Sequence, residues 1–284
     1  MKITSLNVNQ FLGLGTRNEY PSNNPEKKEK KWTELKNQII NIISDSLDKE
    51  DDILFLQEMP YKMYPKHFGP NSVKVSNVYL DLQRICDNKK INIYKTNCNC
   101  DIFKTIALSK GVYEYPVNEE IIKETFRLNG FEDSRLVVLK KSLTLNNKEL
   151  YLIGIHNIAE PYPATLFLRN LEELIKRYLK NKNVIVCGDV NIYNDNILKG
   201  IEQRFLSETD LCDAWLSKGF DNDDEKGFTY YTKNIKTRID KFFINKGKIS
   251  SYEIKVGKEI ENGISDHNSI SLIINEIKEC CQNI

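Results

Sequence analysis

Short runs of apolar residues recur along the chain and set the positions of its predicted β-strands. The runs end in polar or turn-forming residues, which is typical of buried strands that are covered on both faces. They lie at residues 2–8, 52–57, 104–109, 135–145, 150–156, 183–188, 239–244 and 268–274. The pattern predicts a strand at each of these positions.

Two other segments carry apolar residues at steps of three and four, the spacing of an amphipathic helix packed on a sheet. In residues 30–47 the apolar positions are Trp32, Leu35, Ile39, Ile42, Ile43 and Leu47. Residues 166–179 repeat the pattern. Helices therefore alternate with strands in the early part of the chain and around residues 160–190, while adjacent strands dominate elsewhere. This order predicts an α/β or α+β fold.

The composition is even along the 284 residues, and 40% of them are hydrophobic, which is sufficient for a large core. No proline-rich or serine-rich linker and no internal repeat divides the sequence. We therefore predict a single domain over residues 1–284. The segment 12–28 is rich in Gly, Asn and Pro and follows the first predicted strand directly, so we expect an exposed loop there. It is either a flap that contacts substrate or a surface insertion.

The charge and the cysteines narrow the class of protein. A net charge of +1 argues against a protein that holds long nucleic acid by backbone electrostatics alone. The lysines and glutamates of residues 25–32 are interpreted as a solvated helix face, with phosphate binding as the minor alternative. The seven cysteines are odd in number and lack the CxxC spacing of a zinc site, which favours reduced thiols. The CxC pair of Cys98 and Cys100 leaves a soft-metal site as the minor alternative.

The sequence carries no signal for a membrane span or for secretion. No apolar stretch approaches the 18 or so residues that a spanning helix needs. The N-terminal residues also lack the basic flank and apolar run of a signal peptide. We therefore expect a cytoplasmic protein, whereas its protein partners cannot be predicted.

Polar residues with useful chemistry stand where the predicted strands begin or end. The set comprises Asn7, Asn9, Gln57, Glu58, His156, Asn157, Asp189, Asn191, Arg238, Asp240, Asp266 and His267. Ligand sites in sheet proteins form where strand ends and their loops converge, because the strands fix positions while the loops have no core to fill. We therefore predict that these side chains share one edge of the fold.

The chemistry of this set fits a hard metal ion and acid–base catalysis. Carboxylate and carboxamide oxygens suit Mg²⁺ and are poor ligands for zinc. Since Mg²⁺ takes only one or two protein carboxylates, other acids in the set are expected to transfer protons. Two of the three histidines in the chain belong to the set, and an imidazole can donate to phosphate oxygens or protonate a leaving group. Each motif alone has a structural alternative, since Asp after Gly is often a turn residue or helix cap.

Seven motifs in order connect these residues to a known family. They are "TSLNVN" (4–9), "DILFLQE" (52–58), "TIALSKG" (105–111), "LYLIGIHN" (150–157), "VIVCGDVN" (184–191), "FTYYTKNIKTRIDKFFI" (228–244) and "ISDHNSI" (264–270). This series resembles the endonuclease/exonuclease/phosphatase superfamily, the deoxyribonuclease I-like metal-dependent phosphoesterases. The resemblance covers nearly the whole chain. It implies a four-layer sandwich of two packed mixed β-sheets flanked by helices.

The resemblance also implies metal-assisted, in-line hydrolysis of a phosphoester, with a role for most residues of the set and for Arg135. Asp189 would be the base or positioner of the attacking water, and Asn191 would hold that water or the scissile phosphate. Mg²⁺, with Mn²⁺ as a possible substitute, would bind Glu58 and Asn7. The remaining assignments are His156 and His267 on the phosphate oxygens, Asp240 supporting His156, Asp266 on His267 or the metal, and Asn9, Arg135 and Arg238 on the substrate.

Missing features narrow the substrate. "TRIDKF" at 237–242 lacks the Trp-Cys-Asp-Arg pattern of inositol polyphosphate 5-phosphatases, and the signal peptides of secreted sphingomyelinases and pancreatic-type nucleases are absent. We favour a nuclease that acts on DNA or RNA, with Arg17, Lys110, Arg127 and Lys236 flanking its site. The alternatives are a phosphatase or phosphodiesterase for a small molecule or lipid headgroup, and a catalytically silent binding module. Cleavage polarity, the number of metal ions and the oligomeric state are not predicted.

Overall fold

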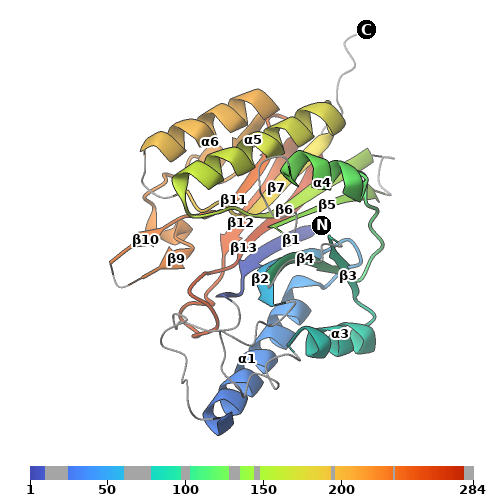
Figure 1. The fold of residues 1–284 in the computed structure, drawn as a ribbon, viewed down its shortest axis with the longest axis vertical. Coiled ribbons are helices and arrows are strands. Elements are labelled where there is room, and N and C mark those ends of the chain that lie inside the picture. The colour runs from blue at the N-terminus through green and yellow to red at the C-terminus, as the bar shows by residue number, and fades with distance from the viewer. Residues whose placement is uncertain are drawn as a thin grey trace.

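The fold is built from two β-sheets that pack face to face (Figure 1). The computed structural model describes residues 1–9, 25–60, 78–96, 103–127, 135–143, 148–192, 196–232 and 234–277. The first sheet has the strand order β12-β13-β1-β2-β4-β3. Within it β1 and β2 are parallel and the other neighbours are antiparallel. Its strands are β1 (Lys2–Asn7), β2 (Ile53–Pro60), β3 (Asn92–Lys95), β4 (Phe103–Ser109), β12 (Ile249–Val256) and β13 (Ile270–Ile277).

The second sheet has the strand order β5-β6-β7-β11-β8, with β6 and β7 parallel and the other neighbours antiparallel. Its strands are β5 (Leu136–Leu143), β6 (Lys148–His156), β7 (Asn183–Asp189), β8 (Leu211–Asp213) and β11 (Asp240–Asn245). A small ribbon of β9 (Tyr230–Tyr231) and β10 (Lys236–Thr237) stands apart from it. Two 3₁₀ turns, η4 (Leu216–Lys218) and η5 (Glu225–Gly227), lie in the connection between β8 and the ribbon.

Helices cover the outer face of each sheet, as Figure 1 shows. Helices α4 (Glu119–Arg127), α5 (Pro161–Tyr178) and α6 (Asn196–Thr209) pack on the second sheet through one apolar cluster. Helices α1 (Pro25–Ser46) and α3 (Val78–Lys89) pack on the first sheet through another. The helix, sheet, sheet, helix order confirms the predicted four-layer sandwich. None of the helices that the structure describes is long and apolar enough to cross a membrane.

Alternating side chains along each strand explain why the sheets bury both faces. In β7, Val184 and Val186 point to the helices, while Ile185 and Cys187 point to the other sheet. A strand with this burial needs apolar residues at every position, which is why the predicted strands were continuous apolar runs. The inter-sheet core is therefore formed by every second residue of the central strands.

Each predicted run is a strand in the structure, and both predicted helices are confirmed as α1 and α5. The loop expected over residues 12–28 was drawn too long, because α1 begins at Pro25. Proline is well suited to the first helical turn, where its missing N–H costs nothing. Residues 12–24 of that predicted loop lie outside the described residues.

Gly154 allows the two sheets to approach each other. It lies in β6 under the ring of Phe55 from β2, and a Cβ atom there would be only 2.2 Å from Phe55 Cδ1. We expect Gly154→Ala to lower the free energy of unfolding by about 1–3 kcal/mol, since overpacking moves the ring or the strand. A urea titration measures the loss.

Gly200 provides the matched control for that measurement. It lies exposed in α6, and an added Cβ would have no atom within 4 Å. Gly200→Ala should raise the free energy of unfolding by about 0.5–1 kcal/mol, because alanine loses less backbone entropy in a helix. Equal stability of the Gly154→Ala protein and the parent would contradict the close contact between the sheets.

Candidate active site

Three polar residues form one row across the second sheet. His156 of β6 is the register partner of Asp189 of β7, and Asp189 is also the partner of Asp240 of β11. Directly paired residues project to the same face of a sheet. The alternation along each strand makes this the inner face, since Leu152, Ile185 and Phe242 belong to the inter-sheet core. The row is therefore the polar end of that core.

The facing row comes from the first sheet and depends on a β-bulge. Regular alternation would place Gln57 toward the second sheet and Glu58 away from it. The register of β2 against β4 shifts between Leu56 and Met59, and Glu58 has a φ of 51°. Both Gln57 and Glu58 consequently face inward, where Gln57 donates to Ser5 Oγ and Glu58 approaches Asn7. Bulges of this kind commonly re-aim side chains beside active sites.

A glycine and an asparagine shape the backbone around Asp189. Gly188 has a φ of 140°, and a Cβ atom there would lie 1.9 Å from the carbonyl oxygen of Ile155. Only glycine fits this approach of β7 to β6. Two residues after Asp189, Asn191 has a φ of 53°, which asparagine tolerates, and its backbone N–H donates to Asp189 Oδ1 at 2.9 Å. These features fix the carboxylate of Asp189 at the end of its strand.

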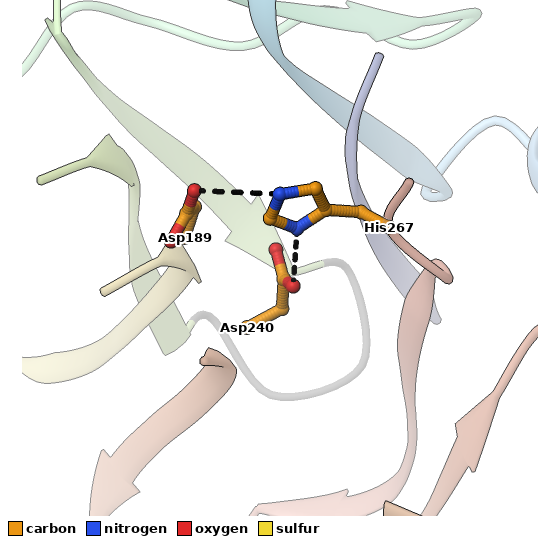
Figure 2. Close-up of side chains that lie close together, drawn as sticks. All are labelled: Asp189, Asp240 and His267. Atoms are coloured by element: carbon orange, nitrogen blue, oxygen red, sulfur yellow. Dashed lines mark hydrogen bonds and ion pairs between the residues drawn. The ribbon is translucent and has the colours of Figure 1, made fainter. Parts of the chain in front are cut away.

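One oxygen of Asp189 lies at the centre of the site. Asn7 Nδ2 donates to Asp189 Oδ2 at 3.1 Å. His156 Nε2 lies 3.9 Å from the same oxygen and His267 Nε2 lies 4.0 Å from it. Figure 2 shows Asp189 facing one ring nitrogen of His267 and Asp240 facing the other. Because Asp189 is only 1% exposed, solvent does not compete for these contacts.

His267 is held by Asp240 and by the turn that precedes it. Its Nδ1 is 2.8 Å from Asp240 Oδ2, as drawn in Figure 2. Its backbone N–H donates to Ser265 Oγ, which in turn donates to the carbonyl oxygen of Asn7. The ring of Tyr230 covers it, with 4.9 Å between ring centroids. The expectation that Asp240 supports His156 is therefore wrong, because Asp240 makes its hydrogen bond to the other histidine.

The surroundings separate the protonation states of these groups. Burial raises the pKa of Asp189 to about 8, and the carboxylate of Asp240 adds to the rise. Burial opposes the charged form of His267, but Asp240 outweighs it and raises the pKa of His267 to about 10. Burial lowers the pKa of His156 to about 3, against the opposing attraction of Glu58. Near neutral pH the site thus pairs a charged His267 with a neutral His156, and Asp189 is more basic than an ordinary aspartate.

The donor atoms fit a hard divalent cation. Asp266 Oδ1 and Asp240 Oδ1 are buried and have no hydrogen-bond partner among the described residues. Burial also raises the pKa of Asp266, although the imidazole of His267, 4.0 Å from Asp266 Oδ1, opposes the rise. Asn7 Nδ2 donates to Glu58 Oε1 at 3.4 Å, and the charge of Glu58 contributes to the raised pKa of Asp266. Glu58 and Asp266 thus offer carboxylate oxygens of the kind that Mg²⁺ takes.

Asp189, Asp240 and His267 form a second group whose ligand atoms all lie within 4.8 Å of one another. In this group Asp240 and His267 already use an oxygen and a nitrogen on each other. Such a hydrogen-bonded pair is better suited to hold a proton than to hold a hard cation. The amide nitrogen of Asn7 donates to the carboxylates of Glu58 and Asp189, so Asn7 positions both of them. The Oδ1 atom of Asn7 accepts from the backbone N–H of Asn9 and is the oxygen that Asn7 offers to a metal ion.

The two arginines expected to bind substrate lie in different places. Arg135 is half-buried beside His156, with its NH1 atom 3.2 Å from His156 Nδ1. Arg238 is only 4% exposed, and it donates to both carboxylate oxygens of Asp213 and to Asn222. The assignment of Arg238 to substrate contact is therefore corrected, because its buried guanidinium is held by Asp213 of β8 and by Asn222.

Of the basic residues predicted to flank the site, one lies beside it and another lies far from it. Lys236 lies on β10 in the ribbon whose other strand contacts His267 through Tyr230. Lys110 follows the end of β4 that pairs with the beginning of β2, and its Nζ donates to the carbonyl oxygen of Asp48. Lys110 thus lies beside the start of β2, at the opposite end of that strand from Glu58. This position contradicts the prediction that Lys110 flanks the site. Arg17, the side chain of Arg127 and the CxC pair lie outside the described residues.

Three residues that support the site were not assigned a role from the sequence. Ser265 joins the turn before His267 to Asn7, and Tyr230 covers His267. Asn157 donates to the carbonyl oxygen of Val190 and accepts from Asn191 Nδ2 through its own carbonyl oxygen. Asn157 belongs to the predicted set of polar residues at strand ends, and the position of Ser265 within the "SDH" motif is the signal that could have singled out that residue.

Comparison with known proteins gives one family and one fold. A family model described as the Endonuclease/Exonuclease/phosphatase family matches residues 4–267 of the chain. Comparison with the curated proteins gives no match. Several solved structures share the fold at identities too low to carry a function by themselves.

Three of these structures illustrate the range. TDP2 from D. rerio, complexed with a single strand DNA product, is 18% identical with a TM-score of 0.60, over 97% of this chain and 99% of that one. The endonuclease domain of TRAS1, a telomere-specific non-LTR retrotransposon, is 12% identical with a TM-score of 0.58, over 98% and 99%. An endonuclease/exonuclease/phosphatase family protein from Leptotrichia buccalis is 17% identical with a TM-score of 0.61, over 97% and 100%.

Proposed function

Because the chain belongs to the Endonuclease/Exonuclease/phosphatase family and is thus a metal-dependent hydrolase of phosphoester bonds, we propose that it is a Mg²⁺-dependent nuclease. The proposed substrate is a phosphodiester bond of DNA or RNA. The observation that carries the proposal is the convergence of Asn7, His156 and His267, from both sheets, on Asp189 Oδ2.

Asp189 is the proposed general base for the attacking water. Its Oδ2 atom faces the two histidines, while its Oδ1 atom is held by the backbone of Asn191. The raised pKa makes it a stronger proton acceptor than an exposed aspartate. Asn191 is anchored to the carbonyl oxygen of Asn157, and in this proposal its side chain holds the water or the scissile phosphate in line.

His267 is the proposed donor of a charged hydrogen bond to the phosphate. Its Nδ1 is engaged by Asp240, so its Nε2–H points into the site toward Asp189. A buried imidazolium there would stabilise the negative charge that develops on phosphate oxygens in the transition state. His156 would contact a second phosphate oxygen from the opposite side of Asp189.

Glu58, Asn7 and Asp266 are the proposed ligands of Mg²⁺, with Mn²⁺ as a possible substitute. A bound divalent ion supplies Lewis-acid stabilisation of charge on the phosphate oxygens. The bulge that turns Glu58 inward brings its carboxylate to 3.6 Å from His156 Nε2, so the ligands and the acid–base groups share one site.

Two similar folds support nucleic acid as the substrate class. The D. rerio TDP2 structure contains a single strand DNA product, and TRAS1 contributes an endonuclease domain. Lys236 stands exposed on the ribbon beside His267, where it could meet a phosphate on the neighbouring nucleotide. A small-molecule or lipid-headgroup phosphoester remains the second candidate, since the catalytic residues would treat it in the same way.

The test is hydrolysis by the purified protein of labelled single-stranded DNA, double-stranded DNA and RNA, with nucleotides and phosphoinositides as the alternative panel. We expect cleavage of a polymer with Mg²⁺ and none with EDTA. Activity that is confined to the small phosphoesters would overturn the nuclease and favour the second candidate. Full activity in EDTA would remove the metal from the proposal.

Glu58→Gln tests the proposed metal ligand directly. We expect the Mg²⁺ concentration for half-maximal activity to rise by about tenfold or more, because a neutral amide is a weaker ligand than a carboxylate. Glu253→Gln, an exposed carboxylate on β12, is the matched control and should leave the titration unchanged. An identical Mg²⁺ titration for Glu58→Gln and the parent would exclude Glu58 as a ligand.

A further inference from the structure

The guanidinium of Arg135 contacts both the ring and the backbone of His156 at the end of β6. Its NH1 atom is 3.2 Å from His156 Nδ1 and 3.4 Å from each of the carbonyl oxygens of His156 and Asn157. Arg135 immediately precedes β5, whose first residue Leu136 pairs with Ile155. The register of β5 and β6 therefore brings the guanidinium to the end of β6, where the chain turns away from the sheet.

The chemistry of arginine fixes the state of the histidine ring. A guanidinium has five N–H donors, has no acceptor and stays protonated in proteins. At 3.2 Å from such a donor, Nδ1 of His156 must present its lone pair. If Nδ1 carried a proton, two N–H donors would face each other and no hydrogen bond could form. The ring proton must then be on Nε2, which is the atom that faces Glu58 and Asp189.

His267 has the opposite arrangement. Its Nδ1 lies 2.8 Å from a carboxylate oxygen of Asp240, which can only accept, so Nδ1 of His267 carries a proton. An anion behind a histidine ring favours the charged imidazolium, whereas a cation behind it favours the neutral ring. The Nε2 atoms of the two histidines lie at nearly equal distances from Asp189 Oδ2. The Nδ1 atom, however, faces Arg135 in His156 and Asp240 in His267.

We propose that Arg135 is a positioning residue that holds His156 as the neutral tautomer with its proton on Nε2. His156 then contributes an uncharged hydrogen bond to a phosphate oxygen. This role in catalysis rests on the proposed phosphoester hydrolysis, but the tautomer of His156 itself does not.

The tautomer is measured by NMR on protein labelled with ¹⁵N-histidine. The chain has only three histidines, so each ring can be assigned by substituting one of them at a time. We expect the His156 ring of the parent protein to show a protonated Nε2 and an unprotonated Nδ1. In Arg135→Met, which keeps length but donates nothing, we expect a mixture of tautomers. Arg135→Lys should restore the parent pattern, and a protonated Nδ1 in the parent would overturn the proposal.

Kinetics give the second readout. Arg135→Met should lower kcat and kcat/KM equally, by about 10- to 100-fold, since the lost donor acts in the transition state. Arg135→Lys should recover most of the loss, and Arg84→Met, at an exposed helix arginine, should change neither value. A rise in KM alone would instead make Arg135 a substrate-binding residue. If the protein cleaves no phosphoester, the proposed function fails while the NMR result still decides the state of His156.

Discussion

Replacing Asp189 with asparagine is expected to lower the rate of phosphoester hydrolysis by about 10²- to 10⁴-fold, the usual contribution of a general base. Asparagine has the same shape, so its single side-chain oxygen can keep the hydrogen bond from the backbone N–H of Asn191, and only the donation from Asn7 is lost. The neutral amide, however, cannot accept the proton of the attacking water. Single-turnover rates at saturating Mg²⁺ measure the loss without interference from product release.

The folded state should survive this substitution. The carboxylate of Asp189 is buried beside that of Asp240, which is an unfavourable place for a charge. We therefore expect the melting temperature of Asp189→Asn to equal or exceed that of the parent. Asp210→Asn is the matched control, because Asp210 is exposed with a φ of 55° that asparagine also tolerates. Near-normal turnover by Asp189→Asn would remove Asp189 from the chemistry.

The pair of His267 and Asp240 gives the second large effect. His267→Gln should lower the rate by about 10²- to 10⁴-fold, because the charged donor to the phosphate is lost. Asp240→Asn should lower the rate by a smaller factor, since an amide oxygen can still accept the hydrogen bond from Nδ1 of His267. Because Asp240 acts through His267, the double variant should be no slower than His267→Gln alone.

A double-mutant cycle on kcat tests this coupling. Both residues are buried, so circular dichroism and thermal melting must first show that each variant is folded. If the two losses multiply in the double variant, Asp240 acts independently of His267, and the group that includes Asp240 and Asp189 becomes the better candidate for the metal site.

The strands, the family and the layer order were predictable because they depend on short-range patterns. A run such as residues 183–188 is apolar at nearly every position, which only a strand buried on both faces requires. Helix α6 and the edge strand β12 were not predicted. In α6 a glycine interrupts the apolar spacing, and β12 has a largely unburied face without a continuous apolar run. Tertiary packing supplies what their local sequence does not.

Within the site, the positions of the residues were predictable but their pairings were not. Asp240 and His267 meet only because β11 lies antiparallel to β7 and because the turn at Ser265 is tied to β1. The sequence order of the motifs contains neither fact. Arg238 was misassigned for a similar reason. It lies two residues before Asp240, but β11 begins at Asp240, so strand alternation does not extend to Arg238.

The alignment of His156, Asp189 and Asp240 as register partners limits how this protein can vary in length. Gain or loss of one residue within β7 would move Asp189 to the helix-facing side of the sheet, away from both neighbours. A second, compensating change in the same strand would be needed to return it. Insertions and deletions should therefore be excluded from β7 and tolerated only in loops that contribute no residue to the site. A library of single-codon deletions, selected for activity, would map this boundary along the gene.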